Sequence, residues 1–286
     1  MAPMPSVQAL ERALDILEAF SPGRFEMGIA ELSQKVNLSA PTVSRLVRTL
    51  AARGYLVQNP GNKKYRLSLK LLDLVAVVQA ERDLYRVSLP VLFRLRNALK
   101  ETVYLDVRDG GERVCFLSLP GLRPVSTVVP VGQRSPLYAG ADARTLLAFL
   151  DDEEIAGYLA NAELKAYASN TITDRDRLWE EIRSCRRYGV AVSVNEFHQG
   201  SACVSAPVRD FSGMVAASLS VSFPDSRADR ETLLSYARSV RQAAGEISAA
   251  LGCRVARNGR SRSLEELVDG FFNFVTGRDG CGPDKN

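Results

Sequence analysis

The stretch SAPTVSRLVRTLAARGYLVQNPGNKKYRL, residues 39–67, decides the fold of the first part of the chain. Ser39 is a good helix N-cap residue, and Pro41 is tolerated in a first turn because the amide it lacks would have no partner there. Apolar residues then recur at helical spacing, at Val43, Leu46, Val47 and Leu50. The stretch therefore predicts a helix that begins at Ser39 and stops at Gly54.

Two short strands are predicted after this helix, over Tyr55–Gln58 and Tyr65–Leu69. The turn sequence Asn59-Pro60-Gly61-Asn62 joins them. Basic side chains follow the turn at Lys63, Lys64 and Arg66. The pattern is typical of a β-hairpin wing beside a helix.

Two further helices are predicted before residue 39. Apolar residues at helical spacing predict the first from Val7 to Phe20, with Ser6 as its N-cap. A second, short helix is predicted around residues 29–36, and Asn37 can close it in a left-handed turn. Three helices followed by a hairpin make a winged helix-turn-helix domain.

The positive charge of the chain is confined to this first part. The whole chain has 37 Lys and Arg against 33 Asp and Glu, and ten of the basic residues and five of the acidic ones lie in residues 1–72. Between Leu32 and Leu72 there are eight basic residues and no acidic one. A basic module attached to a nearly neutral body indicates a partner such as double-stranded DNA.

The outward face of the helix beginning at Ser39 is small, hydroxylated and basic. Such a face suits the major groove, with short side chains near base edges and arginines reaching bases or phosphates. The wing places further basic residues for contacts with the DNA backbone. The predicted DNA-binding residues are Ser39, Ala40, Thr42, Ser44, Arg45, Arg48, Lys63, Lys64 and Arg66.

Composition excludes several other classes of protein. At 286 residues, with 46% hydrophobic and 24% charged residues, the chain suits about two globular domains. It has neither an apolar stretch near the length of a membrane span, about 20 residues, nor a secretory leader, so we expect a cytoplasmic protein that does not bind membranes. Five scattered cysteines without CxxC spacing and a single histidine lead us to expect no metal and no cofactor.

From Thr102 onward the pattern changes to alternation. A hairpin is predicted around the turn Asp109-Gly110-Gly111. Further strands are predicted at residues 125–131, 190–194, 202–208 and 215–223, and helices at residues 141–150, 175–187 and 230–251. This order predicts an α+β domain with a mostly antiparallel sheet flanked by helices.

Segments spread over residues 6–253 resemble the IclR family of bacterial transcription regulators. In the first part they are SVQALERALDIL (6–17), IAEL (29–32), PTVSRL (41–46), GYL (54–56) and YRL (65–67). In the second part they are PLYAGA (136–141), LLAFL (146–150), YGVAVS (188–193) and APV (206–208). The resemblance implies a homodimer or homotetramer, a pseudo-palindromic operator, and an effector-binding domain that takes a small organic acid.

The same resemblance implies an effector pocket. Small residues just before the helix at 141 would let a ligand approach its N-terminus, which favours anions, and Ser220 and Ser222 share one face of a strand. By position the implied contacts are Gly140, Ala141, Ser193, Cys203, Ser220 and Ser222. Two departures affect this pocket: Ala143-Arg144 stands where many relatives have Gly-Lys, and the position of Ser193 is acidic in some relatives.

The expected organisation is a DNA-binding domain over residues 1–70, a linker helix over 71–87, an effector domain over 88–253 and a tail over 254–286. The apolar run from Leu69 to Val78 is too rich for a solvated linker, so the linker helix should bury two faces within its own subunit or against a partner. In the tail, a basic joint precedes a predicted amphipathic helix from Leu264 to Val275, capped by Ser263. We expect this helix to dock on its own effector domain or on a partner.

A regulator whose operator affinity responds to a ligand is the leading hypothesis. An enzyme with an appended DNA-binding module is the alternative, and an architectural DNA binder is a third possibility. The common catalytic motifs are absent, and Cys203 with His198 five residues earlier is the one imaginable nucleophilic pair. Because a cysteine on an apolar strand is usually packed, we expect no catalytic residue.

Overall fold

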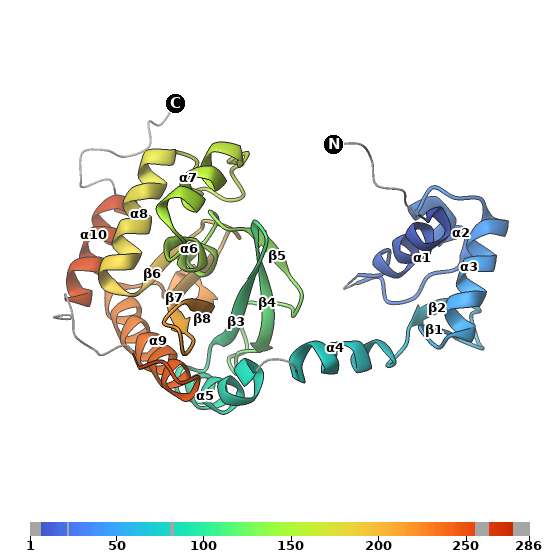
Figure 1. The fold of residues 1–286 in the computed structure, drawn as a ribbon, viewed down its shortest axis with the longest axis horizontal. Coiled ribbons are helices and arrows are strands. Elements are labelled where there is room, and N and C mark those ends of the chain that lie inside the picture. The colour runs from blue at the N-terminus through green and yellow to red at the C-terminus, as the bar shows by residue number, and fades with distance from the viewer. Residues whose placement is uncertain (1–6, 22, 81–82, 255–262, 277–286) are drawn as a thin grey trace. The chain divides into compact units, whose positions relative to one another are not determined.

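The computed structural model describes residues 7–21, 23–80, 83–254 and 263–276. The chain divides into two compact units, Met1–Arg82 and Asp83–Asn286. Figure 1 shows both units. None of the described helices is both long and apolar enough to cross a membrane.

The first unit is a winged helix-turn-helix domain, as the sequence predicted. Its elements are α1 (Gln8–Glu18), α2 (Ile29–Lys35), α3 (Ala40–Ala52), β1 (Leu56–Gln58), β2 (Tyr65–Leu67) and α4 (Leu71–Ala80). The strands β1 and β2 pair antiparallel, with Leu56 opposite Leu67. A small core lies between the helices and the hairpin, and its buried residues are Ile16, Ala19, Met27, Leu32, Val43, Val47, Leu50, Leu56 and Tyr65.

The turns that separate these helices adopt the predicted backbone. Asn37 has a φ of 51° after α2, and Gly54 has a φ of 82° after α3. The predicted cap of α3 differs in detail. Ser39 stands at the N-cap, but its hydroxyl lies 2.9 Å from the Thr42 hydroxyl and makes no side-chain bond to a backbone amide. The Ser39 hydroxyl therefore contacts the Thr42 hydroxyl in place of a backbone amide of α3.

The first helix is shorter than predicted, and only part of its predicted apolar face packs within the unit: Ala13, Leu17 and Phe20 contact the core. It runs over Gln8–Glu18, and its proposed cap Ser6 lies outside the described residues. Ile16 and Ala19 are buried, whereas Val7, Leu10 and Leu14 are exposed. Apolar residues lie on two sides of this helix, and only one side packs within the unit, so periodicity alone could not choose between them.

The second unit is an α+β domain, which confirms the predicted fold class. Its helices are α5 (Asp83–Leu99), α6 (Ala141–Ala148), α7 (Asp152–Asn161), α8 (Arg175–Tyr188), η1 (Asp225–Arg227), α9 (Arg230–Ala250) and α10 (Leu264–Thr276). Its strands are β3 (Thr102–Asp109), β4 (Glu112–Leu119), β5 (Arg134–Pro136), β6 (Ala191–Val194), β7 (Ser201–Arg209) and β8 (Val215–Pro224). They form one antiparallel sheet in the order β5-β4-β3-β8-β7-β6.

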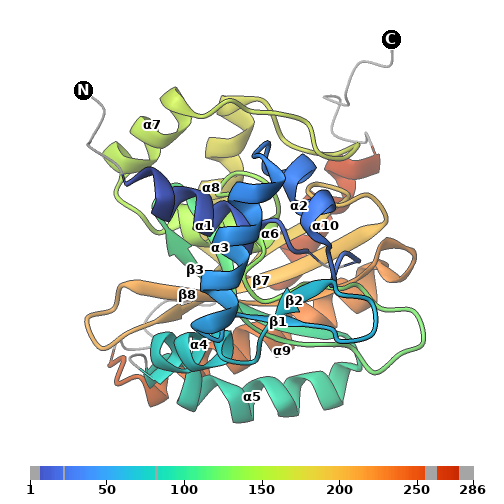
Figure 2. The ribbon, with the colours of Figure 1, turned by 90° about the vertical axis from the view of Figure 1, so that its right-hand side faces the viewer.

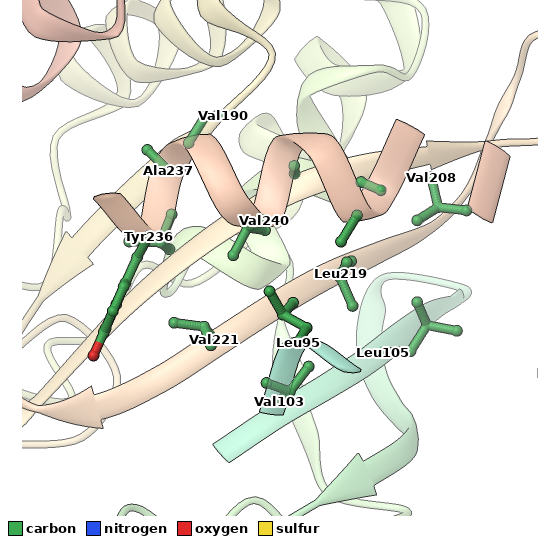
Figure 3. Packing of buried hydrophobic residues seen from close by; sticks show 14 of the residues in the cluster. Leu95, Val103, Leu105, Val190, Val208, Leu219, Val221, Tyr236, Ala237 and Val240 are labelled. Carbon is green, nitrogen blue, oxygen red and sulfur yellow. The ribbon is translucent and has the colours of Figure 1, made fainter. Parts of the chain in front are cut away.

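The two faces of the sheet have different chemistry. On one face Val103, Leu105 and Val221 pack with apolar residues of α5 and α9, as Figure 3 shows. The other face carries Tyr104 and Cys203 and is covered by α6, with α8 packed beyond it. Figures 1 and 2 show this layering of helices on both sides of the sheet. Polar side chains of the second unit are therefore gathered beneath α6.

The predicted strand over residues 125–131 is wrong. Val125, Val128 and Val131 are exposed and lie in a loop, and the next strand is β5. Within the predicted linker helix over 71–87, the structure describes α4 up to Ala80 and α5 from Asp83, and residues 81–82 lie outside the described residues. Leu72, Leu74 and Val77 of α4 are exposed within the chain rather than buried on two faces.

Candidate nucleic-acid interface and candidate ligand cavity

The nine predicted DNA-binding residues lie on α3, at its N-cap and on the wing. Of these, Ser39, Ala40, Arg45, Arg48, Lys63 and Arg66 are exposed, whereas Thr42, Ser44 and Lys64 are partly buried. Arg48 donates to the Ser44 hydroxyl at 3.1 Å. The Thr49 hydroxyl donates to the Arg45 carbonyl at 3.1 Å. This face can present hydroxyls and guanidinium groups to base edges and phosphates.

The wing is shaped by side-chain bonds that sequence reasoning missed. The Asn59 and Asn62 side chains donate to the Glu26 carboxylate, and the bond from Asn62 is 2.8 Å long. These bonds lower the pKa of Glu26, with the bond from Asn62 having the largest effect. Lys63 follows with a φ of 59°, so the turn ends in a left-handed residue whose side chain is exposed.

One predicted DNA-binding residue has a partner within the chain. The Lys64 ammonium lies 3.0 Å from a carboxylate oxygen of Glu31. Glu31 also accepts from the Gly28 amide at the start of α2, and this bond is the main reason why the pKa of Glu31 is lowered. Both Glu26 and Glu31 precede the acid-free window of the sequence, which is why the charge pattern alone did not reveal them.

A small cavity of about 30 Å³ lies beneath the N-terminus of α6. Four of the six predicted effector residues line it: Gly140, Ser193, Cys203 and Ser222. The other lining residues are Tyr104, Arg113, Val129, Gln133, Asp142, Glu196, Phe197, His198 and Ser201. At this volume the cavity holds on the order of two water molecules, so a larger ligand requires the lining to move.

The remaining two predicted effector residues lie beside the cavity and are not part of its lining. The Ala141 amide donates to the Ser193 hydroxyl at 3.0 Å, so a lining residue occupies the first amide of α6. The Ser220 hydroxyl donates to the Ser205 hydroxyl at 3.0 Å, and both residues are fully buried between strands. Ser222, two residues further along β8, reaches the cavity.

The charged side chains of the cavity were missed by sequence reasoning. The Tyr104 hydroxyl donates to Asp142 Oδ2 at 3.1 Å and lies 3.2 Å from Cys203 Sγ. Arg113 Nε lies 3.4 Å from Asp142 Oδ2, and Arg113 Nη1 donates to Asp106 Oδ1 at 2.9 Å. In the sequence these residues are separate polar positions within apolar runs.

Burial controls the protonation of this cluster. Burial raises the pKa of Asp106 well above its ordinary value, despite the neighbouring Arg113. Burial likewise raises the pKa of the Cys203 thiol well above its usual range. The pKa of His198 is lowered, also by burial, and its Nε2 lies 3.0 Å from the Gln133 side-chain nitrogen. Cys203 is therefore a neutral thiol beside a tyrosine hydroxyl, which is the opposite of an activated nucleophile.

A second buried arginine connects α6 to the end of β6. Arg144 forms an ion pair with Glu196, lies 3.8 Å from Glu181, and donates to the Val192 carbonyl at 2.9 Å. Its side chain is fully buried. The Glu196 carboxyl has a raised pKa because its burial outweighs the attraction of Arg144. Since Glu196 also lines the cavity, Arg144 fixes one wall of it.

A larger cavity of about 240 Å³ lies between α8 and α10. Arg177, Glu180 and Glu181 are among its lining residues, and Arg177 forms ion pairs with both glutamates. Its volume exceeds that of the cavity beneath α6. Arg177, Glu180 and Glu181 pair with one another along the surface of α8, however, so we assign the ligand cavity to the converging polar groups beneath α6.

Both units match known protein families. The family model of the IclR helix-turn-helix domain matches residues 9–60, and that of the bacterial transcriptional regulator IclR C-terminal matches residues 76–249. The HTH-type transcriptional regulator XynR of Escherichia coli (strain K12) is 32% identical over 249 residues, which cover 87% of this chain and 99% of that protein. The HTH-type transcriptional regulator KdgR of the same organism is 34% identical over 247 residues, covering 86% and 94%.

Solved structures agree with these matches. An IclR homologue from Microbacterium hydrocarbonoxydans, complexed with 4-hydroxybenzoate, has a TM-score of 0.75 at 25% identity and covers 85% of this chain and 98% of that one. The IclR protein of Thermotoga maritima has a TM-score of 0.73 at 27% identity, covering 86% and 97%. The chain therefore belongs to the IclR family and is a transcriptional regulator with an N-terminal helix-turn-helix DNA-binding domain and a C-terminal effector domain.

Proposed function

We propose that this regulator binds a pseudo-palindromic operator, and that a small organic acid bound beneath α6 changes its operator affinity. The observation that carries the proposal is the cavity, in which Ser193, Cys203 and Ser222 converge on the N-terminus of α6. Helix N-termini favour anions, because their amides and dipole present positive charge. The complex of a structural relative with 4-hydroxybenzoate supports the same class of ligand.

Operator contacts are assigned to α3 and the wing. Arg45 and Arg48, with the hydroxyls of Thr42 and Ser44, would read the major groove, since they share the outward face of α3. Ser39 and Ala40 would approach the DNA at the start of the helix. Lys63 and Arg66 would neutralise phosphates from the wing. Lys64 would contribute less than Lys63, because Glu31 already neutralises part of its charge.

A homodimer or homotetramer would present the recognition helices in pairs. Large apolar side chains are left exposed in the first unit at Leu72, Leu74 and Val77 of α4, at Leu10 of α1 and at its N-cap residue Val7. A second copy that covers them would remove this apolar surface from water. A two-fold dimer explains the two-fold symmetry of the proposed operator.

Regulation would follow from opening of the cavity when a ligand binds. A volume of about 30 Å³ is too small for an aromatic or sugar acid, so a ligand would bind a more open arrangement of α6 and the sheet. A ligand that prefers one arrangement shifts the population towards it. Such a shift, passed through the region around residues 71–87, would alter the spacing of the two recognition helices.

We propose no catalytic role, no metal and no cofactor for this chain. The buried, neutral thiol of Cys203 is a poor nucleophile. Double-stranded DNA as the partner is consistent with a cytoplasmic protein that does not bind membranes. The proposed division is a DNA-binding domain over residues 1–70, a linker over 71–87, an effector domain over 88–253 and an added tail over 254–286.

The test is binding of the protein to its own promoter DNA by fluorescence anisotropy, at two salt concentrations and with a panel of small organic acids. We expect specific binding that weakens with salt, and one acid that changes the affinity. Each acid should also be incubated alone with the protein, and we expect no turnover. Absence of DNA binding at every salt concentration would refute the proposal, and turnover of an acid would support the enzyme alternative.

A further inference from the structure

The carboxylate of Asp142 occupies an unusual position in the ligand cavity. Asp142 is in the first turn of α6 and is only 6% exposed. Its Oδ1 accepts from the Ala143 amide at 2.9 Å, and its Oδ2 accepts from the Tyr104 hydroxyl at 3.1 Å. Arg113 Nε lies 3.4 Å from the same Oδ2. One carboxylate thus engages a helix N-terminal amide, a hydroxyl and a guanidinium at once.

These three groups are the kind that bind the carboxylate of an organic acid. Gly140 makes room for Asp142 among them, because a Cβ at Gly140 would lie 2.7 Å from Asp142 Oδ1. Gly140 also has a φ of 98°, a conformation that side chains other than hydrogen rarely allow. The space that the sequence reserves beside the helix N-terminus is therefore filled by a side chain of the same helix.

The other arginines and the first amide of α6 around the cavity also have carboxylate or hydroxyl partners. Arg113 is held by Asp106 as well as Asp142, and Arg144 is held by Glu196 and Glu181. The Ala141 amide is bonded to Ser193. Among the described lining residues, both carboxylates, Asp142 and Glu196, would repel an incoming carboxylate.

Resting on the proposed function, we propose that Asp142 is an internal anion that occupies the effector's carboxylate subsite. An organic acid binds by displacing the Asp142 carboxylate from Arg113, Tyr104 and the Ala143 amide. Because Asp142 belongs to the first turn of α6, this displacement moves the helix N-terminus and ties ligand binding to a change in the domain. The internal anion also keeps the affinity of the site for acids low, so that only abundant acids occupy it.

The test compares Asp142→Asn and Asp142→Ser with the unaltered full chain. Asn preserves the size of the side chain and removes its charge, whereas Ser also opens space. Benzoate and 4-hydroxybenzoate serve as probes in calorimetric titrations. Removal of one like charge from the subsite should tighten binding of at least one probe by about tenfold or more in both variants. Cooperative thermal unfolding establishes that each variant is folded, and Asp142→Asn decides the outcome if the Ser variant is not.

Asp151→Asn is the matched control. Asp151 is exposed at the N-cap of α7 and makes no side-chain capping bond, so its replacement removes the same charge from the same unit. Its affinity for either acid should equal that of the unaltered protein. If the unaltered protein binds an acid and the Asp142 variants bind it no tighter, the internal-anion proposal is overturned while the proposed function stands. If neither the protein nor the variants bind either probe, the internal anion is overturned together with the choice of organic acids as ligands.

Discussion

Buried arginines organise the effector domain at the level of single residues. Arg144 links α6, β6 and α8 through Val192, Glu196 and Glu181, and its side chain is fully buried. A buried ion pair contributes little net stability, because desolvation offsets much of its attraction. Removing only one partner is costly, however, because it leaves the other charge buried alone. Arg144 therefore serves mainly to position the wall of the cavity that carries Glu196.

Arg144→Met should destabilise the fold by about 3–5 kcal/mol near neutral pH, because Glu196 is left unpaired. The pKa of Glu196 is already raised by burial, and loss of Arg144 raises it further. A carboxyl whose folded-state pKa is raised contributes stability that is present below its unfolded pKa and lost as pH rises through the folded value. The deficit should thus be larger at about pH 8 than at about pH 5, as measured by chemical denaturation.

Two companion variants make this measurement decisive. Arg144→Met combined with Glu196→Gln removes both charges and should recover much of the lost stability. Arg183→Met removes an exposed arginine from α8 and should change stability little. A pH-independent deficit in Arg144→Met would contradict the assigned cause.

On the DNA-binding surface, single substitutions should separate base contacts from phosphate contacts. Arg45→Ala should cost about 1–3 kcal/mol and relax the preference for operator over random DNA. Lys63→Ala should weaken binding to both DNAs similarly and reduce the salt slope by about 1 per subunit. Arg183→Ala in the other unit is the charge-matched control. Anisotropy titrations over a salt series measure all three, and equal effects on both DNAs in Arg45→Ala would remove its role in base recognition.

Residues of the cavity were predictable only in part. Gly140, Ser193, Cys203 and Ser222 were reached through a family resemblance. Arg113 was not predicted as a cavity residue, because its position depends on an irregularity in the pairing of β3 with β4. Leu105 pairs with Leu117, but the next residue, Asp106, pairs with Cys115. Such a bulge turns the following residues to the opposite face. It puts Arg113 beside Asp106 on the polar side, and nothing in the alternation of β4 indicated it.

At the level of elements, the sequence predicted helices most reliably where the apolar residues form a single face. The boundaries of α3 and α9 were predicted within about two residues, because each has one apolar face. The prediction for segment 125–131 failed because the segment lies in a loop, where Val125, Val128 and Val131 are exposed and Val129 is buried against the polar side of the sheet. The buried face of α1 was predicted only in part, since the helix carries apolar residues on both sides and the predicted set included the exposed Leu10 and Leu14. Helical spacing of apolar residues predicts that a helix has a buried face. Which face is buried depends on the element that packs against it.

The tail helix α10 is an element that the family models do not cover, since their match ends at residue 249. Leu264, Leu267 and Val268 are buried in the main core of the effector domain. Arg230 and Arg238 of α9 form ion pairs with Asp269 and Glu265. The helix thus docks on its own domain, the first of the two arrangements expected from the sequence.

Opposite changes within α10 should test this docking. Leu267→Ala should lower stability by about 2 kcal/mol or more, because it empties a packed position. Gly270→Ala should raise it by about 0.5–1 kcal/mol, because a Cβ there meets nothing within 4 Å and alanine favours the helix. A chain that ends at Gly252 should melt at a lower temperature. Identical melting of all three and the full chain would show that α10 adds no stability.

Net charge is unevenly distributed between the two units at the level of the whole molecule. The basic excess lies in the first 72 residues, with α3 and the wing, and the exposed apolar side chains of α4 lie next to them in the sequence. The effector unit is nearly neutral and keeps its charged groups paired around a cavity. DNA binding and ligand binding therefore depend on separate surfaces, and communication between them requires a change that both units share.

The proposed dimerisation through α4 should determine how steeply DNA binding depends on salt. If each subunit neutralises about four phosphates, a dimer releases the counterions of about eight, and log K should fall against log salt with a slope of about −7. Leu72→Asp with Val75→Asp places charge on the exposed apolar side of α4. This variant should sediment as a monomer, bind the operator more weakly and show about half the slope. Phe211→Asp makes a similar change at an exposed apolar residue of the other unit and should leave mass and slope unchanged. A double variant that keeps the oligomeric mass and the full slope would exclude α4 as the interface.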